Sequence, residues 1–263
     1  MLMERPYEAG KPMLTSQRKQ HILNILQRDG QVIAKRVSQE LGLSEDTIRR
    51  DLRELAQEGL LQRVHGGALP ASPAIANFAG REEILVEAKV AIGRAAAQLI
   101  KEGQVVILDG GTTSVQVARH LPRHLQATIV THSARIAIEL LDYPNIEVIL
   151  IGGRLFKHSI VSVGAAAIEA INHIRADVYF MGVTGIHPEA GLSTGDLEEA
   201  YVKYALCKRA AETIVLASQE KLGAASQYVI TSLDEVSGLI VEDSVPDEIL
   251  LPYTQLGLTV IRA

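Results

Sequence analysis

Hydrophobic residues recur at helical spacing in the first part of the chain and predict two helices there. Between positions 16 and 30, apolar residues gather on one face, and Gly30 ends the pattern. A short apolar run at 32–34 fits one strand. Apolar positions from there to residue 41 predict a second helix, which Gly42 terminates.

A third helix is predicted from position 44 onward, and it has a basic outer face. Ser44 is a good N-cap, and Ile48, Leu52 and Leu55 fall at i, i+4 and i+7, so one side is expected to be buried. At about 100° per residue, the opposite side and its flanks carry Asp46, Thr47, Arg49, Arg50, Arg53 and Gln57. The arginines are therefore expected to face outward together.

A β-hairpin is predicted directly after this helix. Residues alternate between the two faces of a strand from Leu61 to His65, and Gly66-Gly67 is a strong signal for a tight turn. Three helices followed by a hairpin are the arrangement of a winged helix-turn-helix, whose recognition helix enters the major groove of DNA. Residues 15–70 are therefore predicted to form a DNA-binding domain.

The pattern changes beyond position 70. The stretch PASPAIANFAG lacks charge, so residues 71–81 are predicted to be a linker. Over 82–263 helical and strand signals alternate, which predicts an open α/β domain with a mostly parallel sheet. The expected strands are QVVILD, ATIVTH, EVILIG, ADVYFMGV, TIVLAS, GLIVE and TVIRA, and the expected helices cover 82–101, 114–121, 165–174 and 197–212, with one more ending at 141.

The composition is that of a folded protein of a reducing compartment. Of 263 residues, 47% are hydrophobic and 22% are charged. The single cysteine, Cys207, excludes an internal disulfide framework and a multi-cysteine zinc site, which favours a cytoplasmic location. The start, MLMERPYEAGKPMLTS, has no apolar stretch, so no secretory signal is expected. No uninterrupted apolar segment reaches the roughly 18 residues of a membrane span, so no membrane association is expected.

Charge is distributed unevenly along the chain. The net charge is −5, yet residues 15–69 hold nine Lys/Arg against seven Asp/Glu, and residues 70–263 hold 15 against 22. A weakly basic head on an acidic body indicates different partners for the two parts. Arginine can bind guanine edges or clamp phosphates. The alternative is that these arginines only form i,i+4 ion pairs on a solvated helix, for example Arg50 with Glu54.

Several loops of the second domain follow predicted strands, where open α/β sheets bind their ligands. Asp109 to Ser114 precedes a helix, and its small residues and hydroxyls suit a phosphate cradle, although the segment is neither a P-loop nor a dinucleotide fingerprint. A plain strand-to-helix turn is the alternative. Lys221, after another strand, could complete the site as a point charge. No cofactor is expected.

The string TIRRDLRELAQEGLLQRVHGGA resembles the signature of the DeoR family of bacterial transcription regulators, in which a winged helix-turn-helix ends in a His-Gly-Gly turn. The resemblance implies double-stranded operator DNA as a partner. The residues expected at the DNA are Lys35, Ser44, Asp46, Thr47, Arg49, Arg50, Arg53, Arg63, His65, Gly66 and Gly67.

The resemblance continues through the second domain, which in this family is similar in fold to ribose-5-phosphate isomerase and coenzyme A transferases and responds to phosphorylated sugars. Asp109 to Thr113 looks like the family's Asp-x-Gly-Thr-Thr, and Glu220 to Gly223 looks like its Ser-Lys-Phe-Gly. Ser218 and His132 depart from the usual Asp and Asn. The residues expected at the effector are Asp109, Gly110, Gly111, Thr112, Thr113, Ser114, Thr131, His132, Gly153, Arg154, Asp196, Glu199 and Lys221.

These patterns predict a repressor of a carbohydrate-metabolism operon that a phosphorylated sugar releases from its operator. A homodimer or homotetramer is expected, because one weakly basic module would bind DNA poorly. Two alternatives remain: a sugar-phosphate isomerase with Asp196, Glu198 or Glu199 as base, and a pure oligomerisation scaffold. No metal site is expected, because Pro122 interrupts the helix between His120 and His124.

Overall fold

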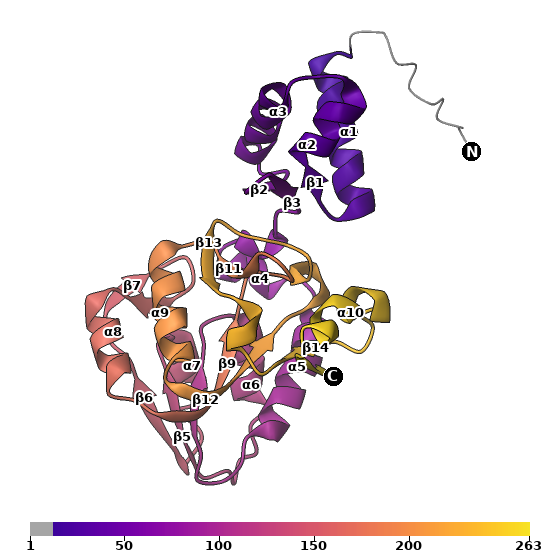
Figure 1. Cartoon of the computed structure of the whole chain (residues 1–263). Coiled ribbons are helices and arrows are strands. Elements are labelled where there is room, and N and C mark those ends of the chain that lie inside the picture. Colours follow the sequence, from indigo (N-terminus) through magenta and orange to yellow (C-terminus); the bar gives the residue numbers. More distant parts are fainter. Residues whose placement is uncertain (1–12) are drawn as a thin grey trace. The chain divides into compact units, whose positions relative to one another are not determined.

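The computed structural model of the chain describes residues 13–263. These belong to two compact units, one that ends at Ala71 and one that spans Ser72–Ala263 (Figure 1). Most of the N-terminal stretch in which no secretory signal is expected, residues 1–12, lies outside the described part of the chain. In residues 13–263, no helix combines the length and the apolar character that a membrane span requires.

The first unit has the predicted winged helix-turn-helix arrangement. Its elements are α1 (Thr15–Asp29), β1 (Val32–Ile33), α2 (Ala34–Leu41), α3 (Glu45–Gln57), β2 (Gln62–Val64) and β3 (Gly67–Leu69). The three strands form an antiparallel sheet in the order β1-β3-β2. Gly30 and Gly42 end α1 and α2 in the left-handed conformation, as the glycine positions predict.

The core of the first unit is the apolar face of α3 packed on α1 and the sheet. Ile48, Leu52 and Leu55 are at most 2% exposed, as is Ile22 of α1. Burial of each such side chain contributes about 1.5–3 kcal/mol. One charged residue of α3 is also buried: Asp51 accepts hydrogen bonds from Arg18, with Nη2 at 2.9 Å from Oδ1.

The second unit is built on a seven-stranded, fully parallel sheet within the described residues, in the order β15-β14-β12-β9-β4-β5-β6. The strands are β4 (Val105–Leu108), β5 (Ala127–Thr131), β6 (Ile146–Leu150), β9 (Ala176–Gly182), β12 (Ala210–Leu216), β14 (Gly238–Val241) and β15 (Thr259–Arg262). All seven predicted strands are present, and the α/β fold with a parallel sheet is confirmed.

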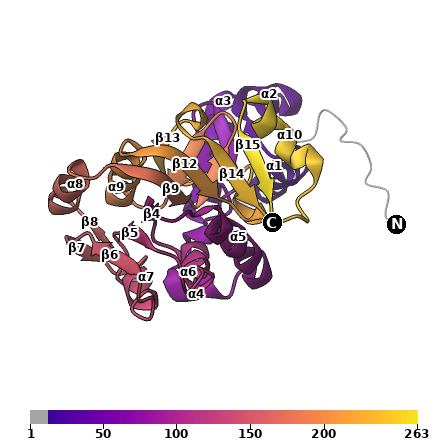
Figure 2. The ribbon, with the colours of Figure 1, turned by 90° about the horizontal axis from the view of Figure 1, so that it is seen from below.

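Each face of this sheet carries its own apolar core. Along β9, Tyr179 and Met181 point into one core, and Val178 and Phe180 point into the other. The second core contains residues of α4 (Phe78–Glu82), α5 (Val86–Leu99), α6 (Thr112–Arg119) and α7 (Ala134–Glu139), and the first contains residues of α8 (Ala165–Asn172), α9 (Leu197–Cys207) and α10 (Asp247–Gln255). Figure 2 shows α5 and α6 on one side of the sheet and α9 on the other.

Several short elements were not predicted, because most of them span only three or four residues, too few for a periodic pattern. They are β7 (Arg154–Phe156), β8 (Val161–Val163), β10 (Gly185–His187), β11 (Gly191–Thr194), β13 (Tyr228–Thr231), α10, and the 3-10 turns η1 (Pro73–Ile75), η2 (Gln219–Lys221) and η3 (Leu233–Glu235). Residues 185–194 form a hairpin, β10-β11, to which β13 adds. The predicted helix over 197–212 stops at Cys207, because β12 begins at Ala210.

The segment predicted as a linker, residues 71–81, is ordered and belongs to the second unit from Ser72 onward. It contains η1 and most of α4, and Phe78 is buried in the core that α5 and α6 share. The linker prediction is therefore wrong from Ser72 onward, because Ser72, Ala74 and Phe78 are buried in the second unit. The predicted helix over 82–101 is also interrupted, because Leu85 adopts a left-handed φ of 44° between α4 and α5.

Candidate functional site

The outer face of α3 is the candidate DNA-reading surface of the first unit. Ser44 caps the helix, with its Oγ 3.2 Å from the amide nitrogen of Thr47. Arg49, Arg50 and Arg53 are exposed, opposite the buried apolar face. The structure therefore brings the predicted arginines together on one accessible surface.

Ion pairing accounts for one of these arginines only. The guanidinium of Arg49 lies 2.8 Å from Glu45 of the preceding turn. No acid within residues 13–263 pairs with Arg50 or Arg53. The Arg50–Glu54 pair that the alternative interpretation offered as an example is absent, since Glu54 pairs with Lys19 at 3.1 Å. Two of the three guanidinium groups thus remain available to a phosphate or a base edge.

The hairpin places two more basic side chains beside glycines that shape the turn. His65 and Gly66 form the loop between paired Val64 and Gly67, and His65 and Arg63 are exposed. Gly66 has a φ of 80°. A Cβ on Gly67 would lie 1.8 Å from the backbone oxygen of Val32. Both glycines are therefore required by the local backbone.

The other predicted DNA contacts lie on exposed or partly exposed positions of the same unit. Lys35 is exposed at the start of α2. Asp46 is exposed and Thr47 is half-buried in the first turn of α3. The structure does not contain DNA, so their contacts to it stay predictions.

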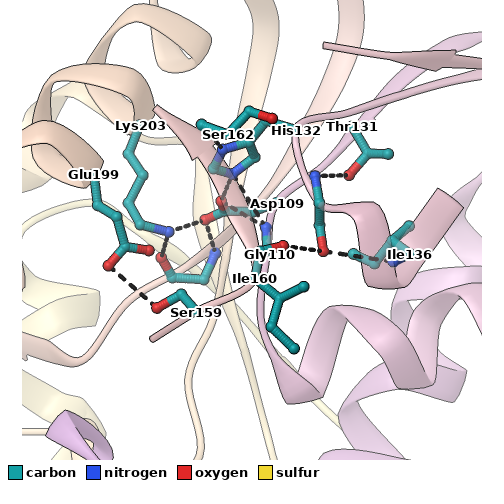
Figure 3. Close-up of polar contacts among 12 residues, drawn as sticks. Asp109, Gly110, Thr131, His132, Ile136, Ser159, Ile160, Ser162, Glu199 and Lys203 are labelled. Carbon is teal, nitrogen blue, oxygen red and sulfur yellow. Dashed lines mark hydrogen bonds and ion pairs between the residues drawn. The ribbon is translucent and has the colours of Figure 1, made fainter. Parts of the chain in front are cut away.

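In the second unit, Asp109 is the centre of a buried polar network at the carboxyl end of β4 (Figure 3). Oδ1 accepts from the amide of Gly110 and faces Nε2 of His132, both at 2.8 Å. Oδ2 accepts from the amide of Gly182 at 2.7 Å and from Nζ of Lys203. Lys203 also donates to the carbonyl of Gly182 at 3.0 Å. The network joins β4, β9 and α9.

The charge state of this network follows from its hydrogen bonds. Burial alone would raise the pKa of Asp109, but the ammonium of Lys203 and the hydrogen bond from His132 hold that pKa well below its usual value. Nδ1 of His132 lies 3.0 Å from the carbonyl oxygen of Ser162, which can only accept. Nε2 also lies 3.3 Å from the amide nitrogen of Gly110, so the imidazole of His132 connects Asp109 and Gly110 to the segment around Ser162.

A pocket opens beside this network, over the N-terminus of α6. It is lined by Ala74, Arg81, Ile84, Lys89, Gly110, Gly111, Thr112, Thr113, Ser114, Gly182, Val183, Thr184, Thr194, Glu199, Lys203, Glu220 and Lys221. Among these residues the cations are Arg81, Lys89, Lys203 and Lys221, and the acids are Glu199 and Glu220. The pocket walls therefore carry an excess of positive charge.

Three of the four pocket cations, Arg81, Lys89 and Lys221, form no ion pair within the described chain, whereas Lys203 pairs with Asp109. Burial lowers the pKa of Lys221 to about 8; Glu220 opposes this effect, whereas Lys89 and Arg81 add to it. Burial also lowers the pKa of Lys89 and of Arg81. An anion in the pocket would offset this cost, because it would restore the favourable environment that water provides to a free cation.

Three buried polar atoms on the pocket wall lack a hydrogen-bond partner within the described chain. They are Nε of Arg81, Oγ of Ser114 and Oε2 of Glu220. Buried polar groups are normally paired, so these atoms indicate a missing polar partner. The first can only donate and the last, when ionised, can only accept, so that partner must offer both acceptors and donors.

About half of the residues predicted at the effector line this pocket: Gly110, Gly111, Thr112, Thr113, Ser114, Glu199 and Lys221. Asp109, Thr131 and His132 are fully buried; Asp109 and His132 form the network that holds Lys203. Gly153 and Arg154 lie outside the pocket, and Arg154 pairs with Glu198. Asp196 caps α9 through the amide of Glu199 at 3.0 Å.

The two residues that depart from the family pattern, His132 and Ser218, do not line the pocket. The hydroxyl of Ser218 donates to Glu220 at 2.8 Å.

Sequence reasoning missed Arg81, Lys89, Thr184, Thr194, Lys203 and Glu220 as pocket residues. Lys203 could have been found, because Val202, Leu206 and Cys207 of the same helix place it on an apolar face. A lysine at such a position requires a buried partner. Arg81 fell in the presumed linker, and its sequence neighbours carry no comparable signal.

In the described part of the chain, no group of three or more His, Cys, Asp or Glu side chains could hold a metal ion. Cys207 is buried, and burial raises the pKa of its thiol. Two of the three acids considered as isomerase bases are engaged elsewhere: Asp196 caps a helix and Glu198 pairs with Arg154. Glu199 lines the pocket and accepts from Ser159 at 3.3 Å.

Comparisons with known proteins agree with this geometry. Residues 18–73 match the profile described as a DeoR-like helix-turn-helix domain, and residues 85–243 match the DeoR C terminal sensor domain. The chain is 36% identical to the HTH-type transcriptional regulator GlpR of Haloferax volcanii, over 95% of this chain and 98% of that protein. It is 29% identical to the glycerol-3-phosphate regulon repressor of Escherichia coli K12, over 92% and 96%.

Among solved structures, the fold resembles ribose 5-phosphate isomerase A from Methanocaldococcus jannaschii. The two chains are 18% identical, the match covers 51% of this chain and 52% of that one, and the TM-score is 0.38.

Proposed function

Because the chain belongs to the DeoR family of transcriptional regulators, we propose that it represses an operon of carbohydrate metabolism and that a phosphorylated sugar or a related metabolite releases it from its operator. The family is one of DNA-binding regulators and not of enzymes. The alternative hypothesis of a sugar-phosphate isomerase is therefore rejected.

The arginines of α3 would read the operator. Arg50 and Arg53 are exposed and lack acidic partners in the described chain, and Arg63 projects from the hairpin. A helix of this kind fits the major groove, and a wing reaches phosphates or the minor groove beside it. A single module with so little excess positive charge would bind weakly, so the protein would act as a dimer or tetramer on repeated half-sites, in the cytoplasm.

The observation that carries the effector proposal is the set of under-compensated cations around the N-terminus of α6. Lys221 and Lys89 are at most 6% exposed, and the free Oγ of Ser114 lies on the same wall. A phosphate group supplies the acceptors that these donors lack. Oε2 of Glu220 would accept from a hydroxyl, as a sugar or polyol provides. The name of the Escherichia coli relative already connects that protein with a phosphorylated polyol.

Release from DNA requires that the effector bind the non-operator form of the protein more tightly than the operator-bound form. The effector would then shift the population of the protein away from DNA. A differential affinity of about 3 kcal/mol corresponds to a roughly 150-fold change in operator binding.

A screen of phosphorylated and unphosphorylated metabolites tests the proposal. The full chain is heated with each of glycerol 3-phosphate, ribose 5-phosphate, glucose 6-phosphate and fructose 6-phosphate, and with the matching unphosphorylated compounds. Stabilisation by at least one phosphorylated member but not by its partner is expected, since a ligand stabilises the native state by mass action. Operator duplexes selected from random DNA then report whether the same compound weakens DNA binding. A flat response to every phosphorylated compound would count against the effector proposal.

A further inference from the structure

Arg81 and Lys89, two of the pocket cations, belong to the stretch of chain that follows the DNA-binding unit directly. The first unit ends at Ala71, and residues 72–89 are the first residues of the second unit. Ala74, Arg81, Ile84 and Lys89 of this stretch line the pocket. The remaining cations come from α9 and from the turn after β12, far along the chain.

The stretch is tied to the pocket wall at several points. Ser72 donates to the backbone oxygen of Thr184, which lines the pocket. The amide of Phe78 donates to the carbonyl of His158 at 2.9 Å. The guanidinium of Arg81 donates to Oγ of Ser159 at 3.2 Å. These are bonds to neutral acceptors, so they position the stretch without neutralising its charges.

Arg81 is half-buried, and its charge is not matched by an ion pair within the described chain. Its Nε has no hydrogen-bond partner in the described chain, and no carboxylate lies within ion-pair distance of it there. Lys89, 4% exposed, donates only to the backbone oxygen of Arg81. Both groups thus have unused donor capacity directed at the same cavity as Lys221 and Ser114.

We propose that Arg81 and Lys89 bind the anionic group of the effector together with Lys221, so that the bound effector fixes the stretch 72–89 that carries the DNA-binding unit. Arg81 is then both a ligand-binding residue and the point at which the sensor holds the chain leading to the DNA-reading surface. This inference rests on the proposed function, because it requires an anionic effector in this pocket.

The physical basis is electrostatic. The charges of Arg81 and Lys89 lower the pKa of Lys221, as burial does, so the three cations repel one another. An anion replaces this repulsion with attraction, and it bridges the stretch 72–89 to the loop 110–114. The bridge restricts the stretch only while the effector is bound, which is the differential interaction that a switch requires.

Hydrogen exchange of the unsubstituted full chain, with inorganic phosphate as the probe, tests the bridge. Phosphate is compared with chloride at equal ionic strength. Slower exchange of backbone amides in both 72–89 and 110–114 is expected. Protection confined to 110–114 and 219–223 would overturn the inference and leave the anion pocket intact. Absence of any phosphate effect in this pocket, together with no response in the metabolite screen, would instead remove the proposed function.

Substitution of Arg81 provides the second test. Arg81→Gln is expected to weaken phosphate binding by at least about tenfold, since hydrogen bonds from charged groups have roughly this strength, and to abolish protection of 72–89. Arg81→Lys should restore part of both effects because it restores the charge. Arg94→Gln is the matched control: Arg94 is exposed on α5 and does not line the pocket. Equal phosphate affinity in the Arg81→Gln and Arg94→Gln proteins would refute the role of Arg81.

Discussion

Lys203 of α9 and Asp109 at the end of β4 form a buried ion pair although 94 positions separate them in the chain. The carboxylate is fully buried and the lysine side chain is 4% exposed. Such a pair holds the helix against the carboxyl end of the sheet, and its second role is to direct an ammonium toward the pocket beside α6. The stability of the second unit and the shape of its pocket are therefore linked.

Removal of the lysine is expected to destabilise the second unit strongly. Lys203→Met leaves Asp109 buried opposite His132 alone, and breaking a buried pair on one side costs about 3–5 kcal/mol. Lys208→Met is the control, since Lys208 directly follows the same helix, is exposed and pairs with Glu235 at the surface. Urea denaturation measures both. If Lys203→Met lowered the free energy of unfolding no more than the control does, the structural role of the pair would be contradicted.

The same pair predicts how the protein responds to acid. The folded-state pKa of Asp109 lies below its unfolded value of about 3.9, so its contribution to stability is complete above that pH and is lost as pH falls below it. In Lys203→Met the carboxyl loses its main cationic partner, its folded pKa rises, and acid unfolding should begin at higher pH. Stability curves of the two proteins against pH, followed by circular dichroism, provide the check. If both proteins lost stability over the same acidic pH range, the ion pair with Lys203 would not be the cause of the low pKa of Asp109.

Effector affinity is predicted to fall on the alkaline side. Burial lowers the pKa of Lys221 to about 8. Below that pH the side chain already carries the positive charge that attracts an anion, whereas above it the side chain must take up a proton when the anion binds. On the acid side, a phosphate monoester loses its second charge near pH 6. Calorimetric titration with the best phosphorylated compound of the screen should show an optimum between these limits. Lys221→Arg keeps the positive charge at high pH, so the fall in affinity above about pH 8 should disappear while the fall at acidic pH remains. If the affinity of the Lys221→Arg protein still fell at alkaline pH, Lys221 would not be the cause of that fall.

Operator affinity should depend on the unpaired arginines of α3. Arg50→Ala is expected to cost about 1–3 kcal/mol if the side chain binds a base, or to reduce the salt dependence of binding by one phosphate contact. Arg28→Ala, which alters an exposed arginine of α1 paired with Asp29, is the control within the same unit. Fluorescence anisotropy over a range of salt concentrations separates the two cases. Wild-type affinity and wild-type salt slope for Arg50→Ala would exclude the predicted contact.

The glycine that closes the wing is predicted to tolerate no side chain. Gly67→Ala would place a Cβ 1.8 Å from the backbone oxygen of Val32, so β3 must separate from β1. Overpacking of this kind costs about 1–3 kcal/mol or more, and operator binding should weaken with it. Gly152→Ala is the control, because its Cβ would meet open space at an ordinary φ. Thermal unfolding compares the two. Normal stability of the Gly67→Ala protein would show that the strands can adjust.

The repeating apolar patterns were sufficient to predict both units. The three helices and the hairpin of the first unit, and all seven strands of the parallel sheet, lie where period and glycine placement predict them, because these signals depend on neighbours a few residues away. The exposed position of Arg50 followed from the buried face of its own helix. The short strands β10, β11 and β13 carry no such signal, since each spans only three or four residues.

The residues of the pocket could be predicted only in part. The sequence by itself determined that the loop 110–114 and Lys221 follow strands and therefore meet at one edge of the sheet. Only the tertiary structure decided that Lys203, Arg81 and Lys89 complete the wall, and that Asp109 and His132 lie behind it as supports. The reason is physical: a buried charge is stabilised by partners that folding brings in from distant segments, and no local period encodes those partners.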